Sequence, residues 1–197
     1  TDVNGDGEAD WPVGWQAVQE VPEIGSGWQF YGGGGHTGDG YVYANYGPSG
    51  TVNSDWLISP KYNVQPGDNF MFYASDDGGS ANYPDIMTVH VSPTGGSEFV
   101  DFTVELDSVT NMGTSWLPYS YDLSAYAGTE IRVAIVYRGE YGYGLNVDDI
   151  AAPEISGEQG PFMYDYPSML DFSYDGATYP GESDTLIFDY FNLGGSD

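Results

Sequence analysis

Cysteine is absent from this chain, and only three of its 197 residues are basic: Lys61, Arg132 and Arg138. Without cysteine, a disulfide framework and thiol chemistry are both excluded. The 30 acidic residues give a formal net charge of −27, so nucleic acid and anionic lipid surfaces would be repelled. No apolar run reaches the roughly 18 residues of a membrane-spanning helix. The sequence therefore predicts a protein that neither binds nucleic acid nor inserts into a membrane.

Groups that could act as a catalytic base or nucleophile are also few. The two histidines are His36, in a glycine run, and His90, in a run of alternating apolar residues. The patterns G-x-S-x-G and H-E-x-x-H, which mark serine hydrolases and zinc proteases, do not occur. Thirty carboxylates would bring some pair to glycosidase spacing by chance. We therefore predict that the protein is not an enzyme. Only a pocket with converging carboxylates or an open metal position would favour catalysis.

Aromatic residues, in contrast, are abundant: 18 Tyr, nine Phe and five Trp. Because each buries a large area with few rotatable bonds, they favour a folded domain with an acidic surface over a disordered chain. Short β-branched and aromatic runs recur between turns rich in glycine and proline. These runs cover residues 70–74, 86–91, 99–106, 119–123, 131–137, 145–150 and 186–191. Their spacing predicts an all-β chain built as an antiparallel β-sandwich, with 131–137 as a central strand that is apolar on both sides.

The composition changes at Pro153. Residues 153–161 (PEISGEQGP) indicate a linker, so the first domain is predicted to span residues 1–152. Residues 162–197 hold two strand-like stretches, near 170–174 and 185–192, which is too little to fold alone. They form either a partial second β element or a docking tail. An extended strand of this kind could also complete the sheet of a neighbouring domain or subunit.

An acidic stretch at the N-terminus has the spacing of a calcium loop. Asp2, Asn4, Asp6, Glu8 and Asp10 place oxygen side chains at alternate positions around glycines, as in the first half of an EF-hand. The twelfth position of that pattern carries no carboxylate, so the loop lacks its bidentate ligand. A polar turn in an acidic protein is the simpler alternative, but composition alone seldom produces this spacing.

Calcium takes six to eight oxygen ligands, so further ligands are needed. They would come from backbone carbonyls, water or a remote carboxylate, for which Asp148 and Asp149 are the candidates. We predict a structural Ca²⁺ ion that stiffens the N-terminal loop and makes stability depend on calcium.

Five tyrosines in glycine-rich segments are candidate ligand-binding residues: Tyr41, Tyr43, Tyr46, Tyr141 and Tyr143. Such segments form loops or sheet rims, where rigid amphipathic rings can stack on a sugar. The alternative is that some of these rings belong to the sandwich core. Sugar, peptide and cell-surface ligands are not distinguished by this pattern.

Three stretches together resemble the cleaved-adhesin and choice-of-anchor J families of bacterial secreted jelly-roll domains. They are residues 55–60 (DWLISP), 115–116 (SW) with 122–128 (DLSAYAG), and 144–150 (GLNVDDI). The resemblance covers roughly residues 10–152. It implies a jelly-roll sandwich on a large exported bacterial protein, often adhesive and commonly holding structural calcium, and it implies no catalytic activity. The tail from residue 162 is similar to the first strands of an immunoglobulin-like domain.

These observations predict a secreted binding or adhesion module of a bacterial surface protein. Its ligand would be an extracellular glycan or protein, and its sequence would be a mature or excised segment of a longer chain. The second interpretation is a structural subunit of a surface assembly, which uses residues 162–197 for contacts with its neighbours.

Overall fold

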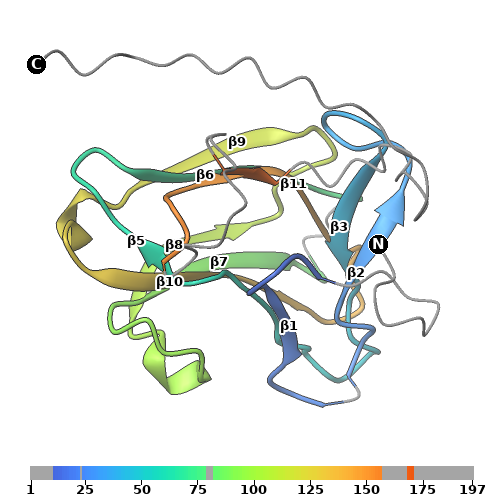
Figure 1. Ribbon diagram of the computed structural model, residues 1–197. Coiled ribbons are helices and arrows are strands. Elements are labelled where there is room, and N and C mark those ends of the chain that lie inside the picture. The colour runs from blue at the N-terminus through green and yellow to red at the C-terminus, as the bar shows by residue number, and fades with distance from the viewer. Residues whose placement is uncertain (1–10, 23, 79–81, 157–167, 171–197) are drawn as a thin grey trace, which may run out of the picture.

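A computed structural model describes residues 11–22, 24–78, 82–156 and 168–170, and it consists of two antiparallel sheets that face each other (Figure 1). The sheet that we call the β10 sheet has the strand order β1 (Gln16–Gln19), β4 (Asp55–Ile58), β10 (Glu130–Gly139), β7 (Asp85–Ser92) and β8 (Val104–Thr110), with β5 (Tyr62–Asn63) also paired to β10. The β11 sheet has the order β2 (Trp28–Gly32), β3 (Gly40–Ala44), β11 (Leu145–Ala152), β6 (Asn69–Asp76) and β9 (Leu117–Asp122), with β12 (Ser168–Leu170) paired to β11.

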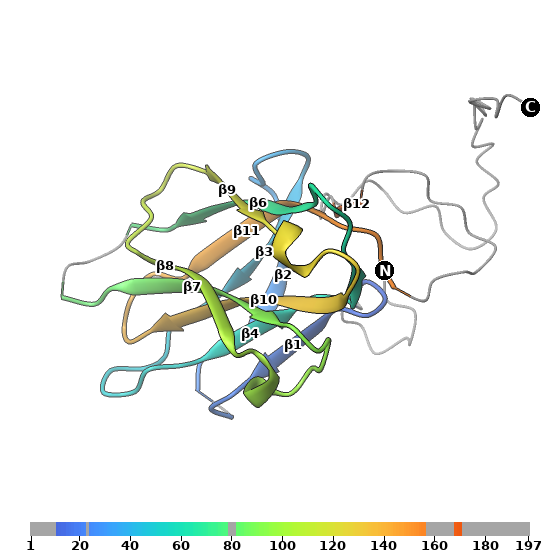
Figure 2. The ribbon, with the colours of Figure 1, turned by 90° about the vertical axis from the view of Figure 1, so that its left-hand side faces the viewer.

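The core lies between the two sheets, which Figure 2 shows as two layers. Phe70, Phe72 and Ala74 alternate along β6 and point into this core, and the strand positions between them face outward. On β10, Val133 and Ile135 enter the same core. The predicted β-sandwich is confirmed.

The β10 strand is apolar on both sides, as the sequence predicts. Its outward residues Ala134 and Val136 join a second apolar cluster on the far side of the sheet, together with Trp56 and Phe102. This cluster is covered by the connection between β7 and β8, which carries the short 3-10 helix η1 (Phe99–Asp101). The prediction of one strand over 99–106 is therefore wrong at its start. Phe99 and Phe102 pack on Trp56, which takes this part of the chain out of the ladder.

The chain beyond β11 does not leave the domain at Pro153. The amide of Asn63 donates to the carbonyl of Glu154 at 2.9 Å, and the amide of Ser156 donates to the carbonyl of Lys61 at 2.6 Å. Residues 153–156 of the predicted linker thus run beside β5. Further on, β12 pairs antiparallel with β11, with Leu170 opposite Ile150. The strand predicted at 186–191 lies outside the described residues.

The two described helices, η1 and η2 (Ser124–Tyr126), are single 3-10 turns. Neither has the length or the apolar character needed to cross a membrane.

A candidate ligand-binding face

The outer surface of the β11 sheet carries a group of exposed aromatic side chains. Along β2 and β3, Trp28, Val42 and Ala44 enter the core, so the residues between them face outward. The register pairs Tyr31 with Tyr41 and Gln29 with Tyr43. On the neighbouring strand, Asn146 lies opposite Tyr43 and also opposite Ser75 of β6. Four neighbouring strands, β2, β3, β11 and β6, therefore place tyrosine, amide and hydroxyl groups on the outer side of this sheet.

Rings on this surface contact one another across the sheet. We call the set Tyr31, His36, Tyr41, Tyr43, Tyr73 and Trp116 the aromatic face. Ring centroids are 5.1 Å apart for Tyr31 and Tyr41, 5.8 Å for Tyr31 and Tyr43, and 5.6 Å for Tyr41 and Trp116. Tyr31 remains 51% exposed. Aromatic rings held by such offset and edge contacts keep their orientation while leaving area free for a ligand.

Polar groups lie among these rings. The Tyr43 hydroxyl donates to Gln29 Oε1 at 2.8 Å, and Asn146 Nδ2 donates to Asp77 Oδ1 at 2.9 Å. Partial burial raises the pKa of the Tyr41 hydroxyl, and the nearby Asp77 carboxylate adds to this effect. The phenol therefore stays protonated and can donate a hydrogen bond at neutral pH.

A glycine-rich loop, residues 32–40, closes one end of the aromatic face and is held by two acids of β11. Asp148 Oδ2 accepts hydrogen bonds from the amides of His36 at 2.7 Å and Thr37 at 3.2 Å. Asp149 Oδ1 accepts from the Thr37 hydroxyl at 2.5 Å, and Asp149 Oδ2 lies 2.6 Å from His36 Nδ1. The His36 ring then stacks on Tyr73, with centroids 3.6 Å apart.

Glycine is required where this loop meets β11. A Cβ on Gly35 would lie 2.5 Å from the carbonyl oxygen of Gly40 and 2.8 Å from Asp148 Oδ2, so any larger residue would push the loop off its carboxylate. Asp149 itself has a left-handed backbone, with φ of 50°, at the irregularity where the register of β11 against β6 shifts. This irregularity turns both neighbouring carboxylates toward the loop.

The two acids predicted as remote calcium ligands thus have defined protein partners. Asp148 Oδ1 accepts the amide of Asp149 at 2.8 Å, so all four carboxylate oxygens of the pair have a hydrogen-bond partner. Burial raises the pKa of Asp148, and the surrounding amides oppose that shift. Among the described residues, no group of three or more His, Cys, Asp or Glu side chains gathers around a possible metal position. Asp2, Asn4, Asp6, Glu8 and Asp10 lie outside the described residues, so the calcium site stays a prediction.

The five predicted tyrosines fall into separate places. Tyr41 and Tyr43 belong to the aromatic face. Tyr46 and Tyr141 lie at one end of the sandwich, with ring centroids 5.9 Å apart. Tyr143 is 50% exposed and lies beside Gly78.

Sequence reasoning did not assign a ligand role to Tyr31, His36 or Trp116. In β2, Trp28 and Phe30 face the core and Gln29 and Tyr31 face outward, but a five-residue run is too short for this alternation to predict a strand. In the sequence, Trp116 stands out only as part of a motif of the resemblance. Its ring centroid lies 6.3 Å from that of His36 and 5.6 Å from that of Tyr41.

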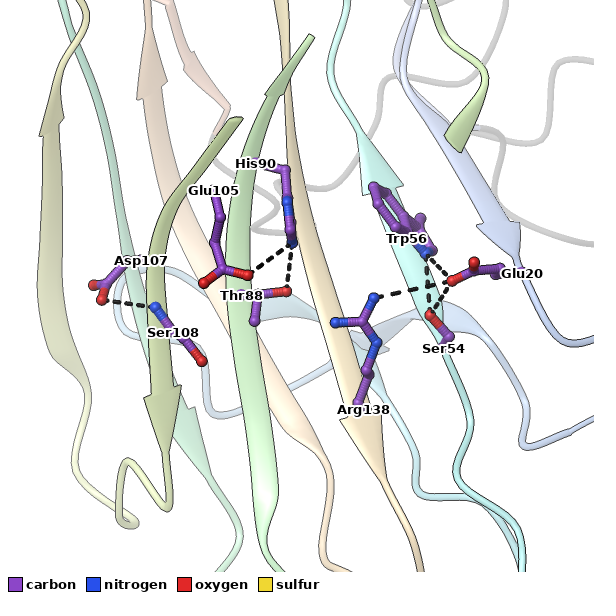
Figure 3. Close-up of polar contacts among 9 residues, drawn as sticks. All are labelled: Glu20, Ser54, Trp56, Thr88, His90, Glu105, Asp107, Ser108 and Arg138. Carbon is purple, nitrogen blue, oxygen red and sulfur yellow. Dashed lines mark hydrogen bonds and ion pairs between the residues drawn. The ribbon is translucent and has the colours of Figure 1, made fainter. Parts of the chain in front are cut away.

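The outer surface of the β10 sheet is different, and Figure 3 shows its polar contacts. Glu20 Oε2 accepts hydrogen bonds from Ser54 Oγ at 2.7 Å and from Trp56 Nε1 at 3.2 Å, and it lies 3.9 Å from Arg138 Nη2. His90 Nε2 lies 2.9 Å from Thr88 Oγ1, and burial lowers the pKa of His90. These groups satisfy one another, so we place the candidate site on the other sheet.

No family model and no curated protein matches the chain. Solved structures do match. The K3 cleaved adhesin domain of Lys-gingipain from Porphyromonas gingivalis is 16% identical, with a TM-score of 0.56 over 71% of this chain and 90% of that domain. The K2 cleaved adhesin domain of Lys-gingipain is 20% identical, with a TM-score of 0.53 over 75% of this chain and 92% of that domain. The chain has the fold of a cleaved adhesin domain.

The resemblance seen in the three sequence stretches is therefore confirmed at the level of the fold. Carbohydrate-binding modules are also among the structural neighbours. One is the xylan-binding CBM22-2 domain from Paenibacillus barcinonensis, which is 14% identical over 70% of this chain and 89% of that domain, with a TM-score of 0.44.

Proposed function

We propose that this protein is an extracellular carbohydrate-binding adhesion module, and that the aromatic face holds the glycan. The observation that supports this proposal is the group of partly exposed rings of Tyr31, Tyr41 and Trp116, which lie in mutual contact on a sheet surface. Rings presented in this way can stack on the apolar faces of sugar rings with little loss of conformational entropy.

The groups between the rings suit the hydroxyls of a sugar. The amide of Gln29 and the hydroxyl of Tyr43 lie at the surface and can donate or accept hydrogen bonds. The strong negative charge of the chain disfavours anionic glycans. The three basic residues do not change this, because none of them belongs to the aromatic face and Arg132 donates to the carbonyls of Ser59 and Gly95. The favoured ligand is a neutral glycan.

The test is affinity electrophoresis and calorimetry with three neutral polysaccharides: xylan, β-1,4-galactan and mixed-linkage β-glucan. Binding to at least one of them is expected. Trp116→Ala and Tyr31→Ala should each weaken that binding about fivefold, because each removes one stacking ring worth about 1 kcal/mol. Val100→Ala is the control, since this side chain is 82% exposed and lies in η1 over the other sheet. Equal binding by Trp116→Ala and Val100→Ala would contradict the assignment of the aromatic face.

We also propose that a structural Ca²⁺ ion binds the N-terminal loop, on the basis of the spacing of its oxygen side chains. Calcium should raise the melting temperature and EDTA should lower it, because an ion that binds only the folded state stabilises that state. The double variant Asp2→Ala/Asp6→Ala should abolish the response. The control is Asp39→Ala/Glu154→Ala, which removes two exposed acids from other parts of the sequence. If the control behaves in the same way as the double variant, general charge screening explains the effect.

The second candidate function is subunit assembly through the tail. The pairing of β12 with β11 favours it, because it shows that this sheet accepts a strand from residues 162–197. Light scattering on the full chain and on a chain that ends at Ser156 separates the two functions. Assembly through the tail predicts an oligomer that the truncation converts to a monomer, and two monomers would remove its support.

A further inference from the structure

Three tyrosines from distant parts of the sequence meet at one end of the sandwich. We call Tyr46, Tyr83 and Tyr141 the end cluster. The ring of Tyr141 is the centre: its centroid lies 5.9 Å from that of Tyr46 and 5.3 Å from that of Tyr83, and both pairs are T-shaped. Their exposed fractions are 37%, 38% and 54% for Tyr46, Tyr83 and Tyr141. Large rings with this much exposure form a surface patch that the fold itself does not use.

The end cluster is separate from the aromatic face because the chain changes sheets between them. After β3, the amide of Gly47 donates to the carbonyl of Gly139 at 3.0 Å, which joins this segment to the end of β10. The amide of Tyr141 donates back to the carbonyl of Gly47 at 2.8 Å. Tyr46 and Tyr141 therefore lie where the two sheets are connected, whereas Tyr41 and Tyr43 lie on the surface of the β11 sheet.

A buried acid makes the base of the end cluster rigid. Asp85 is fully buried and accepts hydrogen bonds from the Tyr137 hydroxyl at 2.5 Å, the amide of Tyr143 at 3.0 Å and the amide of Gly144 at 3.2 Å. A Cβ on Gly142 would collide with this carboxylate. These contacts with Asp85 fix the loop 140–144, so Tyr141 is carried by a rigid loop.

The backbone conformation of Tyr141 is unfavourable for a residue with a large side chain. Its φ is 51°, in the left-handed region where a bulky side chain costs about 1 kcal/mol or more relative to glycine. Glycine occupies both Gly142 and Gly144 of the same loop. A tyrosine kept in this unfavourable conformation, with its ring more than half exposed, indicates a role for the ring at the surface.

We propose that Tyr46, Tyr83 and Tyr141 form a second carbohydrate-binding site, which binds another unit of the same neutral polysaccharide. The choice of ligand rests on the proposed function, but the site itself does not. The three phenols offer stacking surface and hydroxyls. Glu140 lies beside the cluster and accepts the amide of Gly50 at 2.7 Å, so an anionic ligand would meet a carboxylate here as well. Two sites on one rigid domain convert the second contact with a polymer into an intramolecular step.

The experiment compares a polymer with a short ligand. Binding of xylan, β-1,4-galactan and mixed-linkage β-glucan, and of their trisaccharides, is measured for the full chain and for Tyr46→Ala, Tyr83→Ala and Tyr141→Asn, the last because asparagine tolerates a left-handed backbone. Loss of one ring should weaken binding of the polymer by at least about tenfold and binding of the trisaccharide to the aromatic face by less than about twofold. Tyr46→Phe keeps the ring and should bind as the unaltered chain does. Unchanged polymer binding in all three variants would overturn the proposal.

A second measurement separates this site from the aromatic face. Tyrosine ring signals are followed by NMR during titration with each polysaccharide, in the full chain and in Trp116→Ala/Tyr31→Ala. The signals of Tyr46, Tyr83 and Tyr141 should shift in both proteins. If they shift while the aromatic-face variants bind normally, the proposed function of the aromatic face fails and the second site stands. If they do not shift with any of the three polysaccharides, the second site fails whatever the aromatic face does.

Discussion

The two outer faces of the sandwich use the same kinds of residue for opposite purposes. On the β10 sheet, Trp56 is only 4% exposed, because Phe99 and Phe102 cover it with ring centroids 5.2 Å and 5.4 Å away. On the β11 sheet, Tyr31 is 51% exposed and its ring contacts those of Tyr41 and Tyr43 on the same surface. Aromatic side chains are buried by folding on one face and remain exposed on the other.

The polar groups differ in the same way. On the β10 sheet, Glu20, Ser54 and Arg138 interact with one another on the surface (Figure 3). On the β11 sheet, Asp148 and Asp149 hold the glycine-rich loop from beneath, and the side chains of Gln29 and Tyr43 stay at least partly exposed. A sandwich has two outer surfaces, and here a covering loop decides which of them is free to bind.

The largest effect is expected when Trp56 on the β10 sheet and Trp116 on the aromatic face are each replaced by alanine. Trp56→Ala should lower the free energy of unfolding by about 3 to 5 kcal/mol and leave glycan affinity unchanged, because it empties a packed site. Trp116→Ala should cost about 1 kcal/mol or less of stability and lower affinity instead. Urea unfolding and calorimetry on both variants measure the contrast. Equal losses of stability would show that the aromatic face is part of the core.

Asp55, which precedes Trp56 on β4, should make the stability of the protein depend on pH. The Asp55 side chain lies on the inner side of the strand. Burial raises its pKa from 3.8 to about 6, although hydrogen bonds from Gln19 and Asn53 oppose the shift. Because the folded state then binds the proton more tightly than the unfolded state, this carboxyl's contribution to stability is lost as the pH rises from about 4 to about 6. The loss is about 3 kcal/mol.

Asp55→Asn removes that titration. The difference in unfolding free energy between the two proteins should therefore change by about 3 kcal/mol between pH 4 and pH 7.5, in favour of the variant at the higher pH. Urea unfolding at a series of pH values measures it. Parallel curves for the two proteins would show that the interior of β4 tolerates a charge as readily as its outer face does.

A smaller effect on stability is expected from the loop that borders the aromatic face. Gly35→Ala should destabilise the protein by about 1 to 3 kcal/mol, because its methyl group would displace the loop from Asp148. Glycan affinity should fall with it, since His36 and its contact with Trp116 move together with the loop. Gly32→Ala is the matched control, because an added methyl group there meets nothing within 4 Å. Thermal melting and calorimetry that gave the same result for both alanines would contradict this account of the loop.

The smallest effect is expected from Glu20→Gln on the β10 sheet. The amide oxygen can still accept from Ser54 and Trp56, and only the charge opposite Arg138 is lost. An exposed ion pair of this kind contributes about 0.5 kcal/mol or less, so urea unfolding and glycan binding should both be nearly unchanged. A loss of glycan affinity would place the binding site on this face and overturn the comparison.

Apart from β8, the strands from β6 to β11 could be predicted because each is long enough to show alternation or a continuous apolar run. Residues 131–137, for example, became the centre of β10. The strands β1, β2 and β3 are four or five residues long and border glycine-rich segments, so their pattern was too short to recognise. The run at 99–106 misled because Phe99 is apolar for a different reason: it covers Trp56 instead of joining a ladder.

The candidate site was predicted in part. Tyr41 and Tyr43 stand in a glycine-rich segment and do face outward on β3. Trp116, which contacts Tyr41, is more than 70 residues away and directly precedes β9, so the contact depends on β3, β11, β6 and β9 being consecutive in one sheet. The role of Asp148 and Asp149 as supports for the loop at 32–40 depends on the same pairing. No local pattern in the sequence contains it.

The all-β character of this protein and its strongly acidic composition follow from the sequence alone, because they depend on residue content and on the alternation of neighbouring residues. Only the tertiary structure decided which aromatic rings share a surface, which are covered, and that Tyr46, Tyr83 and Tyr141 meet at one end. The physical reason is that a strand's two faces are set by residues next to each other in the chain, whereas the order and register of strands are set by packing between segments far apart.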